Sequence, residues 1–256
     1  MTENKHESAV VSYSDNISIE ARKKIYSNLL AYPATPEESE RSLGLFVRGS
    51  LLARFLATKE LYDQILNLPG VILDLGTWRG QTAVLCENLR AVLEPLHLNR
   101  RIACFDTFEG YVGFGEKDLP TDLHADGTYK VGQDYDSYLS ELLELHEKSN
   151  AMGHNYGKHK VFKGDIRETL PTFFKENPGE VVSLAFFDLN SYAPTSSSFK
   201  TVYDRLVPGG VIAFWQLTRN TIPAEGMVYS NEILRSYKHK IKRAQYYPGL
   251  CYIVKE

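Results

Sequence analysis

The chain has 256 residues, of which 43% are hydrophobic and 24% charged, and its formal net charge is −3. This length and composition are typical of a folded globular chain with a full core, and they exclude a disordered one. The small negative charge argues against nucleic-acid binding, which needs an excess of clustered Lys and Arg. We expect no membrane span, because no apolar run approaches the roughly 20 residues that one requires.

The polar N-terminus has no secretory signal pattern, and the three cysteines do not form a metal-binding motif. Cys86, Cys104 and Cys251 are isolated, odd in number and unlike any zinc spacing. We interpret them as small buried side chains in a reducing compartment. The sequence therefore predicts a cytoplasmic protein.

The hydrophobic periodicity predicts two helices first, over residues 17–31 and 47–68, before Pro69-Gly70 ends the second. From residue 71 onward, short apolar runs alternate with helical segments. Strands are expected over residues 71–73, 101–105, 160–163, 181–187 and 211–215, and helices over 80–93, 135–149, 166–175, 195–206 and 227–237. Two further strands, over 240–246 and 251–255, flank Pro248-Gly249 and predict a hairpin.

Strands that alternate with helices predict an α/β fold with a doubly wound, mostly parallel sheet covered on both faces. The closing hairpin is expected to add an antiparallel edge. Residues 1–68 form an N-terminal helical extension or cap, and residues 69–256 form the ligand-binding domain. We expect a single structural domain overall, because no Pro/Gly/Ser linker divides the chain.

A glycine turn over residues 74–80 (DLGTWRG) leads from the first predicted strand into a helix. Open α/β sheets hold nucleotide-like ligands at such turns, where Gly76 and Gly80 allow close backbone approach. A simple tight turn is the alternative interpretation. The dinucleotide fingerprint requires a second glycine where this chain has bulky Trp78, so a ligand without phosphates suits the turn better.

Acidic residues follow the next strands as well. Asp106 ends the second strand, where a carboxylate can accept both ribose hydroxyls, although a cap or turn aspartate would look the same. Asp165 can accept a hydrogen bond from an adenine amino group while Ile166 packs on the ring. The alternative is that Asp165 caps the helix beginning at Ile166, and both roles are compatible.

Asp188 follows an apolar strand and therefore emerges at the carboxyl edge of the sheet. A carboxylate placed there is costly unless it is used or paired. A functional role for Asp188 is thus the favoured interpretation.

Together these segments resemble the class I S-adenosylmethionine-dependent methyltransferases, which have a Rossmann-like fold. More narrowly, they resemble the macrocin O-methyltransferase family of sugar-modifying enzymes. The similarity covers residues 45–256 and is most specific over residues 105–110 (FDTFEG) and 188–195 (DLNSYAPT). It also includes residues 45–48, 54–56 and 208–210.

The resemblance implies an enzyme that transfers a methyl group from S-adenosylmethionine to an oxygen and releases S-adenosylhomocysteine. The implied acceptor is a small molecule, a sugar or a nucleotide-linked saccharide. The expected cofactor-binding residues are Asp74, Gly76, Thr77, Trp78, Gly80, Asp106, Thr107, Phe108, Asp165, Ile166 and Asp188. The expected acceptor-binding residues are Arg48, Arg54, Asn190, Trp215 and Gln216.

The chain departs from the family where a divalent cation would bind. The family commonly has two consecutive aspartates after the strand that follows Pro-Gly-Gly, and here the matching pair is Trp215-Gln216. Asn190 stands where many members have an acid. Because a hard cation needs several anionic or carbonyl oxygens, we expect no metal ion.

Without a metal, a sugar hydroxyl needs a general base, and Asp188 is the expected one. Tyr192 is expected to orient the acceptor, although a packing role is equally compatible. Arg48 and Arg54 are candidates for binding phosphates of a nucleotide-linked acceptor, or for ordinary salt bridges. Trp215 is expected either to stack on an acceptor ring or to fill the lost metal site.

Other interpretations stay open at this point. The chain could be a non-catalytic S-adenosylmethionine-binding partner protein or a metal-dependent sugar O-methyltransferase. An aminopropyltransferase is disfavoured, because that chemistry needs more acids. Residues 111–133 are expected to form either a lid or a surface loop, and a homodimer is possible.

Overall fold

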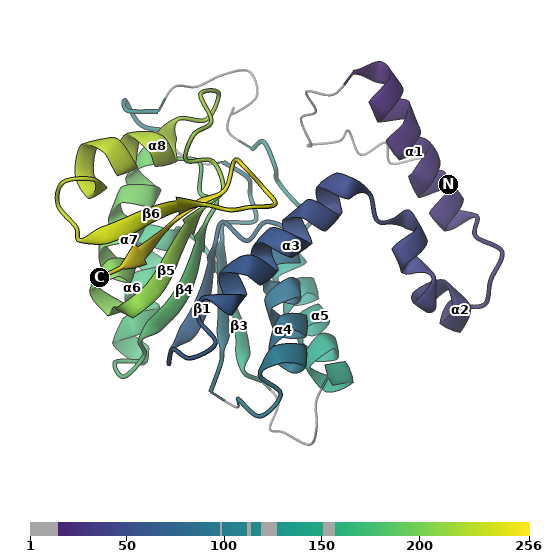
Figure 1. Cartoon of the computed structure of the whole chain (residues 1–256), viewed down its shortest axis with the longest axis horizontal. Coiled ribbons are helices and arrows are strands. Elements are labelled where there is room, and N and C mark those ends of the chain that lie inside the picture. The colour runs from purple at the N-terminus through teal and green to yellow at the C-terminus, as the bar shows by residue number, and fades with distance from the viewer. Residues whose placement is uncertain (1–14, 98, 112–113, 119–126, 151–156) are drawn as a thin grey trace. The chain divides into compact units, whose positions relative to one another are not determined.

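The computed structural model describes residues 15–97, 99–111, 114–118, 127–150 and 157–256. The chain divides into two compact units, Met1–Phe55 and Leu56–Glu256, whose elements are labelled in Figure 1. In the described part of the chain, no helix has both the length and the apolar character needed to cross a membrane.

The smaller unit is helical. Helix α1 (Asn16–Leu30) begins where the Asp15 side chain accepts a hydrogen bond from the backbone N–H of Ser18, and it confirms the predicted first helix. Helix α2 (Pro36–Arg41) has a capping box in which Thr35 and Glu38 bond to each other's backbone N–H groups. Neither α2 nor the 3-10 helix η1 (Leu43–Phe46) was predicted.

Helix α3 (Gly49–Asp63) crosses the boundary between the units and is shorter than the predicted helix over residues 47–68. Beyond Asp63 the backbone continues in turns as far as Leu68, whose N–H donates to Ile65. These turns bring the chain to Gly70, which has a φ of +126° and directly precedes the first strand.

The larger unit contains one sheet. In its described residues, seven strands lie in the order β3-β2-β1-β4-β5-β7-β6. The strands are β1 (Val71–Leu75), β2 (Ile102–Asp106), β3 (His159–Lys163), β4 (Val182–Phe187), β5 (Leu206–Phe214), β6 (His239–Arg243) and β7 (Cys251–Lys255). The first five are parallel to one another, while β7 is antiparallel to both of its neighbours. This confirms the predicted doubly wound fold with a closing hairpin.

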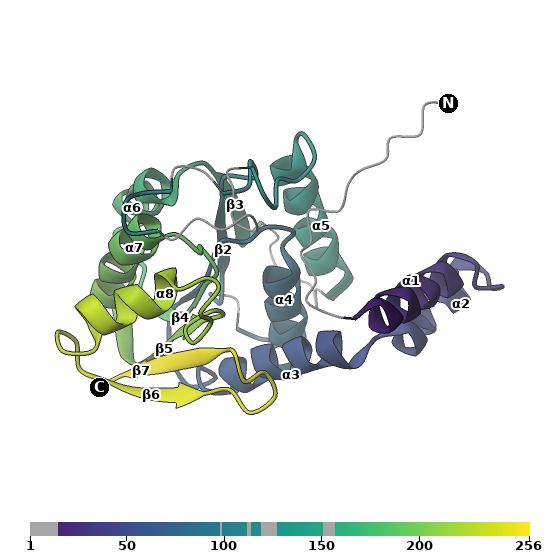
Figure 2. The ribbon, with the colours of Figure 1, turned by 90° about the horizontal axis from the view of Figure 1, so that it is seen from above.

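Helices cover both faces of the sheet (Figures 1 and 2). One face packs against α6 (Ile166–Glu176), α7 (Tyr192–Arg205), α8 (Ala224–Val228) and the π-helical turn η2 (Tyr229–Ile233). The other packs against α4 (Gln81–Leu93), α5 (Tyr135–Asn150) and the part of α3 that belongs to this unit. Alternate residues of a central strand therefore enter different core clusters, as Leu73 and Ile72 of β1 do.

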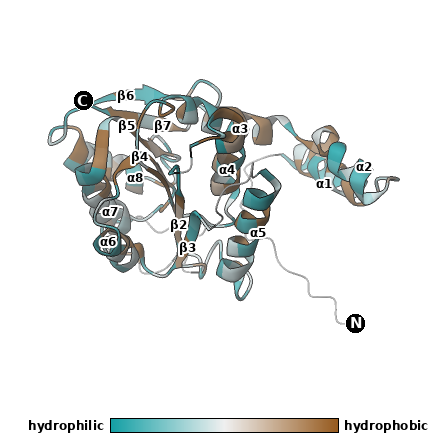
Figure 3. Ribbon diagram, turned by 90° about the horizontal axis from the view of Figure 1, so that it is seen from below, coloured by the Kyte–Doolittle hydropathy of each residue, from teal (hydrophilic) through white to brown (hydrophobic). Residues whose placement is uncertain are grey.

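The hydropathy of the strands follows from this layering. Figure 3 shows hydrophobic residues along the central strand β5, whereas the edge strand β6 is hydrophilic. All five residues of β1 and all six of β4 are buried, which explains why both strands are apolar except at Asp74 and Ser183. The polar sequence of β6 is typical of a strand that closes a sheet edge against water.

The boundaries of β5 and α8 also differ from the sequence-based predictions. Strand β5 begins at Leu206, before the Pro208-Gly209-Gly210 turn that was expected to precede it. Leu206 pairs with Val182 of β4, and the register shifts before the regular pairing of Val211 with Leu184. Because the pairing with β7 begins only at Val211, Pro208 removes no hydrogen bond on that side. The helix predicted over residues 227–237 begins earlier, at Ala224.

Candidate functional site

The candidate site lies at the carboxyl ends of β1, β2 and β4. The chain runs from β1 outward to β2 and β3, then returns to place β4 on the other side of β1. Ligands of open α/β sheets bind at such a reversal of strand order. The backbone there is tied together, because the N–H of Gly76 donates to Phe105 and the N–H of Asp188 donates to Leu75.

Three residues at these strand ends have unusual backbone conformations. Trp78, Phe108 and Asn190 have φ values of +49°, +59° and +59°, in the left-handed region that residues with side chains rarely adopt. They follow β1, β2 and β4, respectively. Strained residues of this kind cluster at ligand sites, where the surrounding structure holds them in place.

Gly76 lets the turn after β1 approach the end of β4 closely. It has a φ of +84°, and a Cβ there would lie 2.4 Å from the backbone carbonyl oxygen of Asp188. Position 76 therefore requires glycine so that the turn can pack against the backbone that carries Asp188. Gly80 has a φ of +79° and is the N-cap of α4, where a Cβ would meet the side chain of Leu139.

Replacing Gly76 with Ala is expected to destabilise the protein by at least about 2 kcal/mol, because a strained φ is combined with a backbone clash. Gly127→Ala is the matched control, since Gly127 has a similar φ of +82° but no atom of the described residues within 4 Å of where its Cβ would lie. That control should cost about 1 kcal/mol. Urea denaturation measures both changes, and equal losses would contradict the role assigned to the clash.

Asp106 joins the ends of β2 and β1. Its Oδ2 accepts the backbone N–H of Trp78 at 2.7 Å, and its Oδ1 accepts that of Phe108 at 2.7 Å. Burial raises the pKa of Asp106 above its ordinary value, and the charge of Asp188 acts in the same direction, against these two hydrogen bonds. Each carboxylate oxygen has a second lone pair, so Asp106 can still accept from a ligand hydroxyl.

The structure shows Asp165 as the N-cap of α6. Its side chain accepts the backbone N–H of Arg167 at 2.8 Å and forms an ion pair with the same residue's guanidinium. Ile166 is only 5% exposed and packs in the core beneath. The capping role that the sequence left open is thus present, and the role toward adenine stays a prediction.

Other residues of the predicted cofactor set support the turns. Asp74 is 3% exposed within β1. The Thr77 hydroxyl donates to the carbonyl of Asp74 and accepts the N–H of Phe105, so it ties β1 to β2. The Thr107 hydroxyl donates to Gly110, and Phe108 is 3% exposed.

Asp188 is partly exposed and lies in a group of polar side chains. The amide nitrogen of Asn190 donates to the backbone oxygen and to Oδ1 of Asp188, at 3.1 and 3.2 Å. Tyr111, from the segment after β2, forms a side-chain hydrogen bond with Asn190. Burial and the nearby charges, that of Asp188 first, raise the pKa of Tyr111 above its ordinary range.

The sequence-based prediction missed Glu225, which is completely buried near Asp188. It lies in the first turn of α8, and its Oε2 accepts the backbone N–H of Gln216 at 2.7 Å. The sequence contained little indication of its role, because Glu225 precedes the helix that was predicted over residues 227–237. In the structure the helix begins at Ala224 and includes Glu225.

Tyr192 is in the first turn of α7 and packs in the core, with 5% of its surface exposed. Its hydroxyl donates to Glu232 at 2.6 Å, and its backbone N–H donates to Asp118 at 2.7 Å. These bonds give Tyr192 an anchoring role between α7 and η2. The predicted catalytic role stays a prediction.

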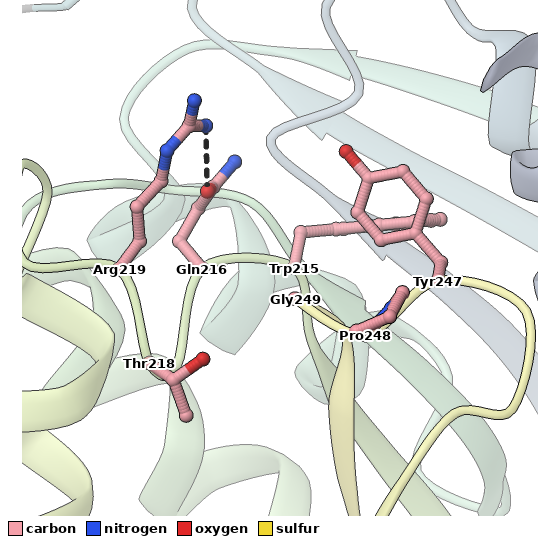
Figure 4. A pocket seen from close by; sticks show the side chains of 7 residues that line it. All are labelled: Trp215, Gln216, Thr218, Arg219, Tyr247, Pro248 and Gly249. Carbon is pink, nitrogen blue, oxygen red and sulfur yellow. Dashed lines mark hydrogen bonds between the residues drawn. The ribbon is translucent and has the colours of Figure 1, made fainter.

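A cleft of about 400 Å³ opens between the loop after β5 and the β6–β7 hairpin. In Figure 4, Arg219 and Gln216 lie on one side of it, joined by a hydrogen bond of 3.0 Å, and Trp215 and Tyr247 lie on the other. The Trp215 and Tyr247 rings meet edge-to-face with centroids 5.4 Å apart, and Trp215 also stacks on Phe186. Thr218, Pro248 and Gly249 complete the lining.

Two remaining predictions lie elsewhere. Arg48 and Arg54 belong to the smaller unit, where the Arg48 guanidinium donates to Ser50. Their role toward an acceptor stays a prediction. The predicted lid over residues 111–133 falls partly outside the described residues, which there include 114–118 and 127–133.

Comparison with known proteins identifies the family. The family model described as macrocin-O-methyltransferase (TylF) matches residues 53–223. A crystal structure of CalS11, described as calicheamicin methyltransferase, is 30% identical with a TM-score of 0.88, over 95% of this chain and 94% of that one. An apo structure of CalS11, described as TDP-rhamnose 3'-O-methyltransferase, is 29% identical with a TM-score of 0.80, over 95% and 96%.

A more distant structure, the O-methyltransferase NovP, is 16% identical with a TM-score of 0.60, over 93% of this chain and 98% of that one. It shows similarity of fold alone. No curated protein matches the chain. From the family match and its agreement with the fold, the chain belongs to the macrocin O-methyltransferase family and is an S-adenosylmethionine-dependent methyltransferase with the class I fold.

Proposed function

We propose that this enzyme methylates a hydroxyl group of a sugar, free or nucleotide-linked, without a metal ion and with Asp188 as the general base. The observation that carries the proposal is the position of Asp188 at the end of β4, beside the glycine turn after β1. The name of CalS11, a TDP-rhamnose 3'-O-methyltransferase, supports a sugar acceptor.

The strand ends fit S-adenosylmethionine. Gly76 lets the turn after β1 pack against the end of β4, and Asp106 stands one strand away with lone pairs left to accept ribose hydroxyls. The bound cofactor supplies an electrophilic methyl group on a sulfonium, so the protein needs mainly to align the acceptor and remove its proton. Asp188 would accept the proton that the acceptor hydroxyl loses as its oxygen takes the methyl group.

The cleft beside Trp215 suits a nucleotide-linked sugar. Arg219 offers a cation for a phosphate on one side, and the partly exposed ring of Tyr247 offers an apolar surface on the other, backed edge-to-face by Trp215, which is only 2% exposed. Gln216 lies between them and can hydrogen-bond a sugar hydroxyl. Its amide oxygen already accepts from Arg219.

The residues present do not fit the divalent cation of the family. Trp215 has an indole in place of a carboxylate, and Gln216 has its amide oxygen 3.0 Å from a guanidinium nitrogen. A positive group at that oxygen disfavours a second cation there. Within the described residues, no group of three or more His, Cys, Asp or Glu side chains is suited to hold a metal.

Isothermal titration with S-adenosylmethionine and S-adenosylhomocysteine, first in EDTA and then in Mg²⁺, tests this proposal. We expect binding with the same dissociation constant in both buffers, followed by methyl transfer from labelled S-adenosylmethionine to TDP-rhamnose in EDTA. Turnover that appears only with Mg²⁺ would refute the metal-free mechanism. Binding of S-adenosylmethionine without transfer to any sugar nucleotide would instead point to another acceptor class.

A further inference from the structure

Glu225 is a buried carboxylate with no cationic partner among the described residues. None of its surface is exposed, and its Oε1 has no hydrogen-bond partner there, while Oε2 accepts only the Gln216 N–H. An ionised carboxylate in this environment would cost several kcal/mol unless paired. A retained proton neutralises the group and so removes the cost of a buried, unpaired charge.

The position of Glu225 is tightly fixed. The Gln216 N–H holds its Oε2, and the next residue, Gly226, packs so closely that a Cβ there would lie 2.6 Å from the carbonyl oxygen of Leu217. The start of α8 is therefore packed closely against the loop after β5 where Glu225 lies.

Among the described residues, the titratable groups that interact electrostatically with Glu225 are Asp188 at the end of β4, Tyr111 in the segment after β2, and Cys251 in β7. The cation on the loop after β5, Arg219, hydrogen-bonds the amide oxygen of Gln216. Burial first, and then the charge of Asp188, raise the pKa of Glu225 well above its ordinary value. Burial likewise raises the pKa values of Tyr111 and Cys251, so neither contributes a charge at neutral pH.

We propose that Glu225 is a positioning residue that keeps its proton beside Asp188, so that the two carboxyl groups carry a single negative charge and Asp188 holds it. Two neighbouring carboxyl groups in a dry site do not both ionise, and the more buried one keeps the proton. Glu225 is completely buried, whereas Asp188 is partly exposed at the strand end. This inference rests on the proposed role of Asp188 as the base.

The consequence for the reaction is that Asp188 stays available as a base. A neutral Glu225 adds no negative charge near Asp188 and so does not favour protonation of Asp188. If Glu225 were ionised, its charge would raise the pKa of Asp188 and leave the base protonated over more of the working pH range.

Infrared spectroscopy tests the proton directly. At pH 7 the wild-type protein should show the carbonyl stretch of a protonated carboxylic acid, which Glu225→Gln should lose and Asp188→Asn should keep. A band that disappears in Asp188→Asn instead would overturn the proposal, as would its absence from the wild type. This measurement needs no turnover, so it separates a failure of the proton assignment from a failure of the proposed acceptor.

The pH dependence of kcat/KM with TDP-rhamnose is the second test. Glu225→Gln mimics the protonated acid, so its acidic limb should coincide with that of the wild type and its kcat should stay within about threefold. Glu225→Leu removes the polar group, and its kcat should fall on the order of tenfold or more. A shift of the acidic limb of Glu225→Gln to lower pH would mean that Glu225 is ionised in the wild type, and would overturn the proposal.

Discussion

Replacing Asp188 with Asn is expected to lower kcat for methyl transfer by about 10²- to 10⁴-fold, the range that a general base contributes. The variant keeps the shape of the side chain but loses its negative charge and its capacity to accept a proton. The backbone bonds at this position, from the Asp188 N–H to Leu75 and from Asn190 to the Asp188 carbonyl, are unaffected by the change. The fold of the strand end should therefore persist.

Calorimetry and steady-state kinetics together check this prediction. The dissociation constant for S-adenosylhomocysteine should change little, while kcat and kcat/KM fall by similar factors, because the lost interaction is made in the transition state. Asp106→Asn is the matched control, since it changes the neighbouring strand-end acid. That control should weaken cofactor binding more than it lowers kcat. An Asp188→Asn enzyme with wild-type kcat would show that the acceptor loses its proton to another group.

The strand-end acids could be predicted because their signal is local. Asp106 and Asp188 each follow an apolar run, and in a parallel sheet every such run delivers its last residue to the same edge. The doubly wound class of the fold also followed from the alternation of strands and helices. The hydrogen-bond partners of these acids could not be predicted, because the bonds join segments that are distant in the sequence. The bond from the Trp78 N–H to Asp106, for example, spans 28 positions.

Glu225 was missed because its importance depends on tertiary packing. In the sequence it is one acid in a Pro-containing stretch, and only the position of α8 against the loop after β5 buries it. The cleft beside Trp215 is a similar case. The sequence drew attention to Trp215 and Gln216, but Tyr247 reaches them only because the β6–β7 hairpin folds back onto β5.

Local capping signals would have improved the helix predictions. The capping box of Thr35 and Glu38 is visible in the sequence, three residues apart, and marks the start of α2. No element was predicted for residues 32–46, because hydrophobic periodicity alone does not reveal a helix of only six residues. Proline is, however, favoured in the first turn of a helix, which is where Pro36 lies.

Replacing Arg100 with Met is expected to destabilise the larger unit by about 3–5 kcal/mol, the cost of leaving one partner of a buried ion pair unpaired. Arg100 is completely buried and forms a bidentate pair with Glu94, at 2.8 and 2.9 Å. Its guanidinium also donates to the carbonyls of Gly70 and Ile65 and to the Ser183 hydroxyl. The loss of all these bonds leaves several buried acceptors unsatisfied.

The adjacent arginine provides the matched control. Arg101 pairs with Glu180, but 44% of its side chain is exposed, so Arg101→Met should cost no more than about 1 kcal/mol. The free energies of unfolding come from urea denaturation monitored by circular dichroism. Similar losses in the two variants would mean that burial does not set the stabilising effect of these arginines.

The double variant Arg100→Met/Glu94→Leu should be more stable than Arg100→Met alone, because it removes the carboxylate that the single change leaves buried. The network lies at the opposite end of the sheet from Asp188: Gly70 precedes β1, and Ser183 is near the start of β4. The folded fraction of Arg100→Met should therefore bind S-adenosylhomocysteine as the wild type does. A large change in that affinity would show that the two ends of the sheet are coupled, so that the stabilising amino end and the catalytic carboxyl end could no longer be treated as independent.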